Sequence, residues 1–121
     1  METKSKAVEK LDASTIFWLP SNPQGDIRGT KKDTKEILDL AKACKERCSL
    51  LIDLSKAEMP NLEQKKAVAK AGQKYKFHKI AVYGYSWRMK LVVDFVVKLV
   101  GEINVELFKN REQALKWIRE K

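Results

Sequence analysis

The stretch that decides the fold runs over Phe77–Arg119 and reads FHKIAVYGYSWRMKLVVDFVVKLVGEINVELFKNREQALKWIR. An apolar segment of strand length, Lys79–Gly84, is followed by a serine and then by apolar residues at helical spacing over 87–100. A second apolar segment, Ile103–Phe108, leads into an amphipathic helix that begins after Asn110. Strands that alternate with helices across short loops are typical of parallel sheets covered by helices. This stretch therefore predicts an α/β fold.

The N-terminal part of the chain predicts two strands, a loop and a helix. Residues 5–12 and 14–19 have the length of short strands and are close enough to pair in antiparallel. The proline- and glycine-containing segment that follows is expected to be a loop, because no strand passes through it unbroken. Thr30, with Asp33 three residues later, predicts a capping box at the start of a helix with an apolar face over Ile37–Cys44.

The middle of the chain predicts a buried strand and a further helix. Ser49–Leu54 is almost continuously apolar, as expected for a parallel strand covered on both faces. Asn61 and Gln64 form a second capping box, and their helix is expected to end at Gly72–Gln73. We therefore expect one domain over residues 1–121, with a four- to five-stranded mixed, mainly parallel sheet flanked by about four helices.

Composition places the chain among soluble globular proteins. Hydrophobic residues make up 44% and charged residues 34% of 121 residues, which is enough to bury a core without disulfides. The most apolar window, Leu91–Val100, contains two charged residues and is far shorter than the roughly 20 residues that span a bilayer. The N-terminus lacks the apolar segment of a secretory signal. We therefore expect a cytoplasmic protein.

The two cysteines and the single histidine do not predict a metal site. Cys44, Cys48 and His78 supply three ligands, where a structural zinc site needs four. Their spacing would place Cys44 and Cys48 on one helix face, with Cys48 at the helix end. We interpret them as reduced thiols of structural character and expect no metal and no cofactor.

Positive charge is concentrated in one window of the chain. The net charge is +9, and eight basic residues with no acidic residue lie between Glu63 and Asp94. The lysines on and after the predicted helix form a basic patch of Lys65, Lys66, Lys70, Lys74 and Lys76. Such a patch favours an anionic partner such as a membrane surface, and a solvated helix face is the alternative. We do not expect nucleic acid, because no aromatic residues alternate with these lysines.

Three motifs carry a resemblance to a known family. They read SLLIDLSKA over 49–57, KIAVYGYSWRMKLVVDFV over 79–96 and VELFKNREQALKWI over 105–118. Together they make Ser49–Arg119 resemble the SpoIIAA-like branch of the STAS superfamily, the sulphate transporter and anti-sigma factor antagonist domains. The resemblance implies a non-enzymatic domain that binds a protein partner, a nucleotide or another small ligand. It also implies a relation to CRAL-TRIO-like domains, which hold lipids.

One family feature is missing from this chain. The antagonist branch carries a phosphorylatable serine in an Asp-Ser-Ser-Gly motif that opens the helix after the Asp-Leu-Ser strand. The corresponding residues 58–62 read EMPNL, without serine, threonine or glycine. Asn61 can cap a helix but cannot accept a phosphate, and Ser55 lies out of register on the preceding turn. The departure argues against a partner switch controlled by phosphorylation.

Candidate ligand-binding residues lie at the carboxyl ends of the predicted strands, where ligands bind in open parallel sheets. They are Asp53, Ser55, Gly84, Tyr85, Ser86 and Arg88. Gly84 permits close backbone approach, Ser86 begins a helix whose first amides attract an anion, and Arg88 adds positive charge. Alternatively, Ser86 only caps its helix and Asp53 only accepts an amide of the next turn. No nucleophile elbow, P-loop or HExxH motif is present, so we expect no enzyme and no catalytic residues.

The helix predicted over 87–100 carries a wider apolar stripe than one sheet face requires. A second subunit, a lipid-like ligand or the N-terminal segment is expected to cover the remainder. The sequence therefore predicts a STAS-like binding or regulatory domain that acts through a protein partner or a small anionic or lipid-like ligand, and a homodimer. The alternative is a lipid-binding or membrane-proximal carrier module that uses this helix and the basic window 65–90.

Overall fold

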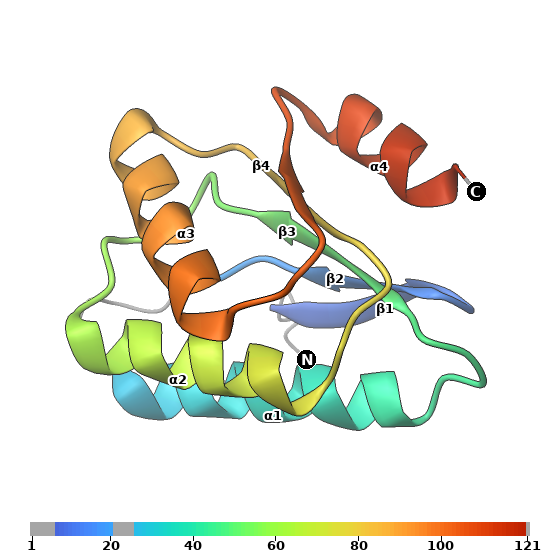
Figure 1. Cartoon of the computed structure of the whole chain (residues 1–121), viewed down its shortest axis with the longest axis horizontal. Coiled ribbons are helices and arrows are strands. Elements are labelled where there is room, and N and C mark those ends of the chain that lie inside the picture. The colour runs from blue at the N-terminus through green and yellow to red at the C-terminus, as the bar shows by residue number, and fades with distance from the viewer. Residues whose placement is uncertain (1–6, 21–25, 121) are drawn as a thin grey trace, which may run out of the picture.

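A computed structural model describes residues 7–20 and 26–120 as a five-stranded sheet with helices on both faces (Figure 1). The strands lie in chain order, and only the first pair is antiparallel. The elements are β1 (Val8–Asp12), β2 (Thr15–Trp18), α1 (Ile27–Lys42), β3 (Ser49–Asp53), α2 (Leu62–Lys74), β4 (Ile80–Tyr83), α3 (Trp87–Val100), β5 (Val105–Leu107) and α4 (Arg111–Arg119). The predicted α/β class and mixed, mainly parallel sheet are confirmed.

The helices form two unequal layers. α1, α2 and α3 cover one face of the sheet, and α4 alone lies on the other (Figure 1). Successive strand residues alternate between the layers, so that Ile16 and Trp18 belong to the core under the three helices while Phe17 belongs to the core under α4. This two-sided burial is the physical reason for the continuously apolar strands. None of the described helices is long and apolar enough to cross a bilayer.

The predicted start of α1 was wrong. The helix begins one turn earlier than expected, because the Asp26 carboxylate accepts a hydrogen bond from the Gly29 amide at 3.1 Å and acts as the N-cap. Thr30 is instead a buried helical residue whose hydroxyl donates to the Asp26 carbonyl at 3.3 Å. Asp33 is also buried and accepts a hydrogen bond from Trp18 Nε1 at 3.1 Å. Parts of the expected first strand (5–12) and loop (20–29) lie outside the described residues.

The predicted end of the second helix was also wrong. α2 continues through Gly72 to Lys74, because Gly72 serves close helix packing and not termination. A Cβ atom at Gly72 would lie 3.2 Å from Cγ2 of Val100 on α3, which is tighter than ordinary van der Waals contact. The next side chain strengthens this junction, since Gln73 Nε2 donates to the Leu99 carbonyl at 2.9 Å.

Neither cysteine lies in a helix, which corrects the prediction for both Cys44 and Cys48. α1 ends at Lys42, and Cys48 is a buried residue directly before β3. Its amide donates to the Tyr75 hydroxyl at 3.0 Å. Burial raises the pKa of the Cys48 thiol to about 11, so the group is protonated at neutral pH. This environment favours a structural thiol over a reactive one.

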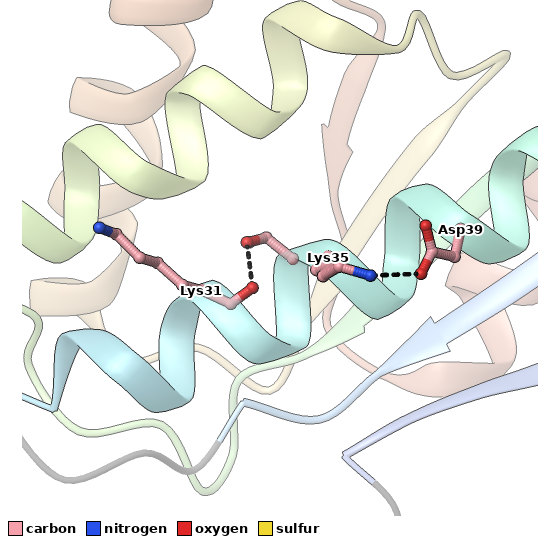
Figure 2. A network of polar contacts seen from close by, with 4 residues as sticks. Lys31, Lys35 and Asp39 are labelled. Atoms are coloured by element: carbon pink, nitrogen blue, oxygen red, sulfur yellow. Dashed lines mark hydrogen bonds and ion pairs between the residues drawn. The ribbon is translucent and has the colours of Figure 1, made fainter.

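The two faces of α1 differ in character. Figure 2 shows Lys31, Lys35 and Asp39 along the helix, where Lys35 Nζ lies 3.2 Å from Asp39 Oδ2. Both side chains are exposed, so this ion pair contributes a few tenths of a kcal/mol, about the value of other helical pairs. On the inner face, Thr34 is buried and its hydroxyl donates to the Lys31 carbonyl at 3.1 Å.

Lys79, the residue directly before β4, attaches the C-terminal end of α4 to the sheet. This lysine is only 8% exposed, and its Nζ atom donates to the carbonyls of Trp117 at 2.6 Å and Glu120 at 2.8 Å. The ammonium also lies 4.9 Å from the centre of the Trp117 ring. The last carbonyls of a helix have no partner within the helix, so a buried cation at this end satisfies them.

We therefore expect Lys79→Met to lower the free energy of unfolding by about 2–3 kcal/mol, because it removes two hydrogen bonds from a charged donor and keeps an apolar stem. Urea denaturation followed by circular dichroism measures the change. Lys76→Met, at an exposed lysine three residues away, is the control and should stay within about 0.5 kcal/mol of the native chain. Equal stability of the two variants would show that Lys79 does not anchor α4.

Candidate functional site

A largely apolar cavity of about 180 Å³ lies between the sheet and the layer of α1, α2 and α3. We call it the helix–sheet cavity. Its floor is formed by apolar side chains of the parallel strands, among them Leu50, Ile80, Val82 and Val105. Its roof is formed by one face of α3, where every lining residue after Met89 is a valine: Val92, Val93, Val96, Val97 and Val100.

α3 packs against the core by its first half and against α2 by its last turn. Met89 is the one buried residue of the helix and belongs to the core, and Val92 and Val93 pack against this core. The Ser86 hydroxyl accepts a hydrogen bond from the Met89 amide at 3.2 Å and so caps the helix itself. At the last turn, α2 approaches Val100 closely at Gly72. Valine side chains are short, and those of α3 line the cavity.

Polar side chains gather at one end of the helix–sheet cavity. They belong to the first turns of α1 and α2 and to the loop after β3, and comprise Thr30, Thr34, Glu58, Gln64 and Lys65. Gln64 is central, since its Nε2 atom donates to Thr30 Oγ1 at 3.2 Å and its Oε1 atom accepts from the Asn61 amide at 3.0 Å. The second bond completes the capping box predicted from Asn61 and Gln64.

Sequence reasoning missed these polar residues as part of a site. One signal was present, because Thr30 and Thr34 lie four residues apart on the same helical face as Ile37 and Leu38. Threonines within an apolar stripe indicate a face that does not meet a fully apolar surface. The true helix start was needed to recognise this signal.

The structure brings three of the predicted site residues together at the carboxyl ends of β3 and β4. Asp53 Oδ1 accepts a hydrogen bond from the Ser55 amide at 2.9 Å, as in the simpler of the two interpretations. Gly84 has a φ of 76°, and a Cβ atom there would lie 2.8 Å from Asp53 Oδ1. The glycine is therefore required by both conformation and space.

The other three predicted site residues follow directly in the chain but do not converge on one point. Ser86 caps α3, as described above, and Tyr85 is half-buried against the core. Arg88 is exposed, with its guanidinium carbon 5.2 Å from the centre of the Trp87 ring. Anion binding over Gly84–Arg88 remains a prediction.

A second polar contact near this edge lies on the α4 side of the sheet. Arg111 Nη1 donates to the buried Tyr83 hydroxyl at 3.4 Å, and the guanidinium stacks 5.0 Å from the Phe17 ring centre. Burial raises the pKa of Tyr83, and the hydrogen bond from Arg111 opposes this shift. The arrangement attaches α4 to β4. Among the described residues, no group of three or more His, Cys, Asp and Glu side chains could hold a metal ion.

Comparison with known protein families matches the SpoIIAA-like model over residues 25–119, which is most of the chain. The chain belongs to the SpoIIAA-like family. The match confirms the resemblance carried by the three motifs and extends it over α1, which the motifs did not include. No curated protein matches the chain at a significant level.

In this SpoIIAA-like domain Asn61 caps α2, as predicted. Asn61 Oδ1 accepts a hydrogen bond from the Gln64 amide at 2.8 Å at the start of α2. Ser55 lies on the preceding turn and is exposed. Asn61 and Gln64 thus cap the start of α2 together.

The outer face of α3 exposes large apolar side chains. Trp87 is 71% and Leu91 is 59% exposed, and Phe95 and Leu99 continue the same stripe at helical spacing. On α2, Lys66, Lys70 and Lys74 of the basic patch lie one turn apart and are exposed. Lys65 differs, because it lines the cavity and its ammonium lies 5.2 Å from the Phe95 ring centre.

Proposed function

We propose that this SpoIIAA-like domain is a non-catalytic binding module that holds a small apolar ligand in the helix–sheet cavity. The observation that supports this most directly is the cavity, which occupies about 180 Å³ under a roof of valines. An engineered apolar cavity of roughly 150 Å³ stays dry and binds benzene. The space in this domain is therefore sufficient for a ligand of at least that size.

Packing favours an occupant. Protein interiors are packed as densely as organic crystals, so an apolar space of about 180 Å³ is unusual. A ligand that fills the space contacts its apolar lining and stabilises the folded state by mass action.

A regulatory role follows from the position of α3. The same helix lines the cavity with its inner face and exposes an apolar stripe on its outer face. A ligand that pushes on the inner valines changes how the outer stripe is presented to a protein or membrane partner. The free thiols of Cys44 and Cys48 support a reducing, cytoplasmic location for this activity.

Benzene is a suitable probe of the cavity. We expect it to shift the methyl resonances of Val93 and Val97 in the native chain. Val93→Phe fills the cavity from α3 and should abolish binding while folding is retained, and Val97→Leu is a milder filling variant. Leu91→Phe adds a similar ring on the outer face of the same helix and should bind as the native chain does. No benzene binding to the native chain, or equal binding to Val93→Phe, would contradict the proposal.

A second candidate function, contact with an anionic membrane surface, is favoured by the exposed stripe on α3. Trp87 and Leu91 are the kinds of side chain that enter the headgroup region of a bilayer. Arg88, Lys90 and Lys98 lie on the same helix, with Asp94 as its one acidic residue. The basic patch on α2 adds positive charge beside them, and each lysine near an anionic surface contributes about 1 kcal/mol.

Vesicle binding tests this candidate. We expect the domain to sediment with vesicles of phosphatidylcholine mixed with phosphatidylglycerol, and not with phosphatidylcholine alone. Tryptophan emission should shift to the blue, because Trp87 leaves water while Trp18 is already buried. Leu91→Glu and the triple reversal of Lys66, Lys70 and Lys74 to Glu should each abolish binding.

The matched control reverses three exposed lysines of equal total charge, Lys10, Lys109 and Lys116, which lie away from α2 and α3. This control should keep most of the binding. Equal loss in both triple variants would mean that only net charge matters. Absence of vesicle binding together with a dimer disrupted by Leu91→Glu would assign the stripe to a second copy. Capture of single-stranded nucleic acid in place of vesicles would equally overturn the membrane assignment.

A further inference from the structure

The helix–sheet cavity has two chemically different ends. Its polar residues lie at the carboxyl edge of the sheet, where α1 and α2 begin. Gln64 and Lys65 are the two on α2, and Gln64 is buried whereas Lys65 is half-buried. The opposite end lies where α2 and α3 finish and β4 and β5 begin. There the lining consists of Gly72, Phe77 and Ile103 with other apolar residues. A ligand that matches both ends must itself be polar at one end and apolar along its length.

Most of the polar end is already saturated by internal hydrogen bonds. Thr30 donates to the Asp26 carbonyl and accepts from Gln64, while the Gln64 oxygen accepts from the Asn61 amide. Among the described residues no buried side-chain nitrogen or oxygen lacks a partner. These groups therefore form a fixed polar wall, and a ligand head group must meet a side chain outside it.

Lys65 is that side chain. It is half-buried in the first turn of α2 and lines the cavity. Its ammonium lies over the ring of Phe95, on the exposed stripe of α3, so the charge stands between α2 and α3 at the outer margin of the cavity. Within the described residues Lys65 makes no ion pair. Glu58 also lines this end, but it is exposed and its repulsion of an anion is screened by water and salt. Asp33 is buried behind the wall, hydrogen-bonded to Trp18.

We infer that the cavity takes a single-chain amphiphile with a carboxylate head, held with the head at Lys65 and the tail directed toward Phe77 and Ile103. The inference rests on the proposed function. The cavity volume indicates the length of the tail. A cavity of roughly 150 Å³ holds benzene, so about 180 Å³ corresponds to roughly six to eight carbon atoms. A phospholipid with two long chains exceeds this space, so the ligand class is a medium-chain carboxylic acid.

Octanoate and 1-octanol separate the head group from the tail. Calorimetric titration should show that the native chain binds octanoate more tightly than 1-octanol. Lys65→Met keeps the aliphatic stem and removes the charge, so it should weaken octanoate binding about fivefold, the scale of a partly exposed ion pair, and leave 1-octanol unchanged. Lys66→Met, at the exposed neighbouring lysine, is the control and should bind both as the native chain does.

Chain length and orientation supply independent readouts. Affinity should rise from butanoate to octanoate and stop rising by dodecanoate. Nuclear Overhauser effects should connect the terminal methyl group of octanoate with Phe77 and Ile103, and its first methylene group with Lys65. The reverse orientation would overturn the inference, as would equal binding of octanoate and 1-octanol that Lys65→Met leaves unchanged. In both cases benzene still binds, whereas failure of benzene as well would overturn the proposed function itself.

Discussion

The short side chains on the inner face of α3 are the constraint on which the helix–sheet cavity depends. A parallel sheet needs a covering layer, and α3 supplies it over β4 and β5 with a row of valines. Leucine or phenylalanine at these positions would reach the strands and fill the gap. Met89, Val92 and Val93 pack α3 against the core, and Gly72 lets α2 approach Val100 at the end of the helix.

The two helix layers differ in how completely they pack against the sheet. The α4 side is filled by Phe17, Leu51 and Ala81 against Ala114 and Ile118, and the buried Lys79 ammonium closes it. This side needs no further component. The three-helix side contains the cavity, the polar wall of Thr30 and Gln64, and the exposed stripe of α3. The larger core cluster also lies on the three-helix side, so this layer contains both most of the buried core and the cavity, and the α4 side contains the smaller cluster.

Local signals in the sequence predicted the elements well where one side chain decides an end. Asn61, Ser86 and Asn110 cap their helices as expected. Predictions failed where a second residue competes or where tertiary contacts decide. Asp26 precedes Thr30 by one turn and caps α1 first, and Gly72 looks like a helix end but serves the approach of α2 to α3. The first choice is a local competition between two possible caps, and the second is not visible without the neighbouring helix α3.

The candidate site could be predicted only in part for the same reason. The excess apolar width of the helix over 87–100 indicated a covering partner or ligand, and the structure has a cavity on one side of that helix and an exposed stripe on the other. A cavity volume depends on how the side chains of several elements fail to meet, and no single segment encodes it. The contribution of Lys65 was hidden for a related reason, because the sequence presents it as one lysine among several in a basic patch.

A crystal structure under xenon pressure tests the central claim most directly, because xenon binds apolar cavities without hydrogen bonds or charge. The account predicts xenon between the α3 valines and β4, in contact with Val82 and Val97. It also predicts that α3 keeps its distance from the sheet when the gas is absent. Absence of xenon from this space, with α3 settled against the strands and the valines in direct contact with the sheet, would contradict the account.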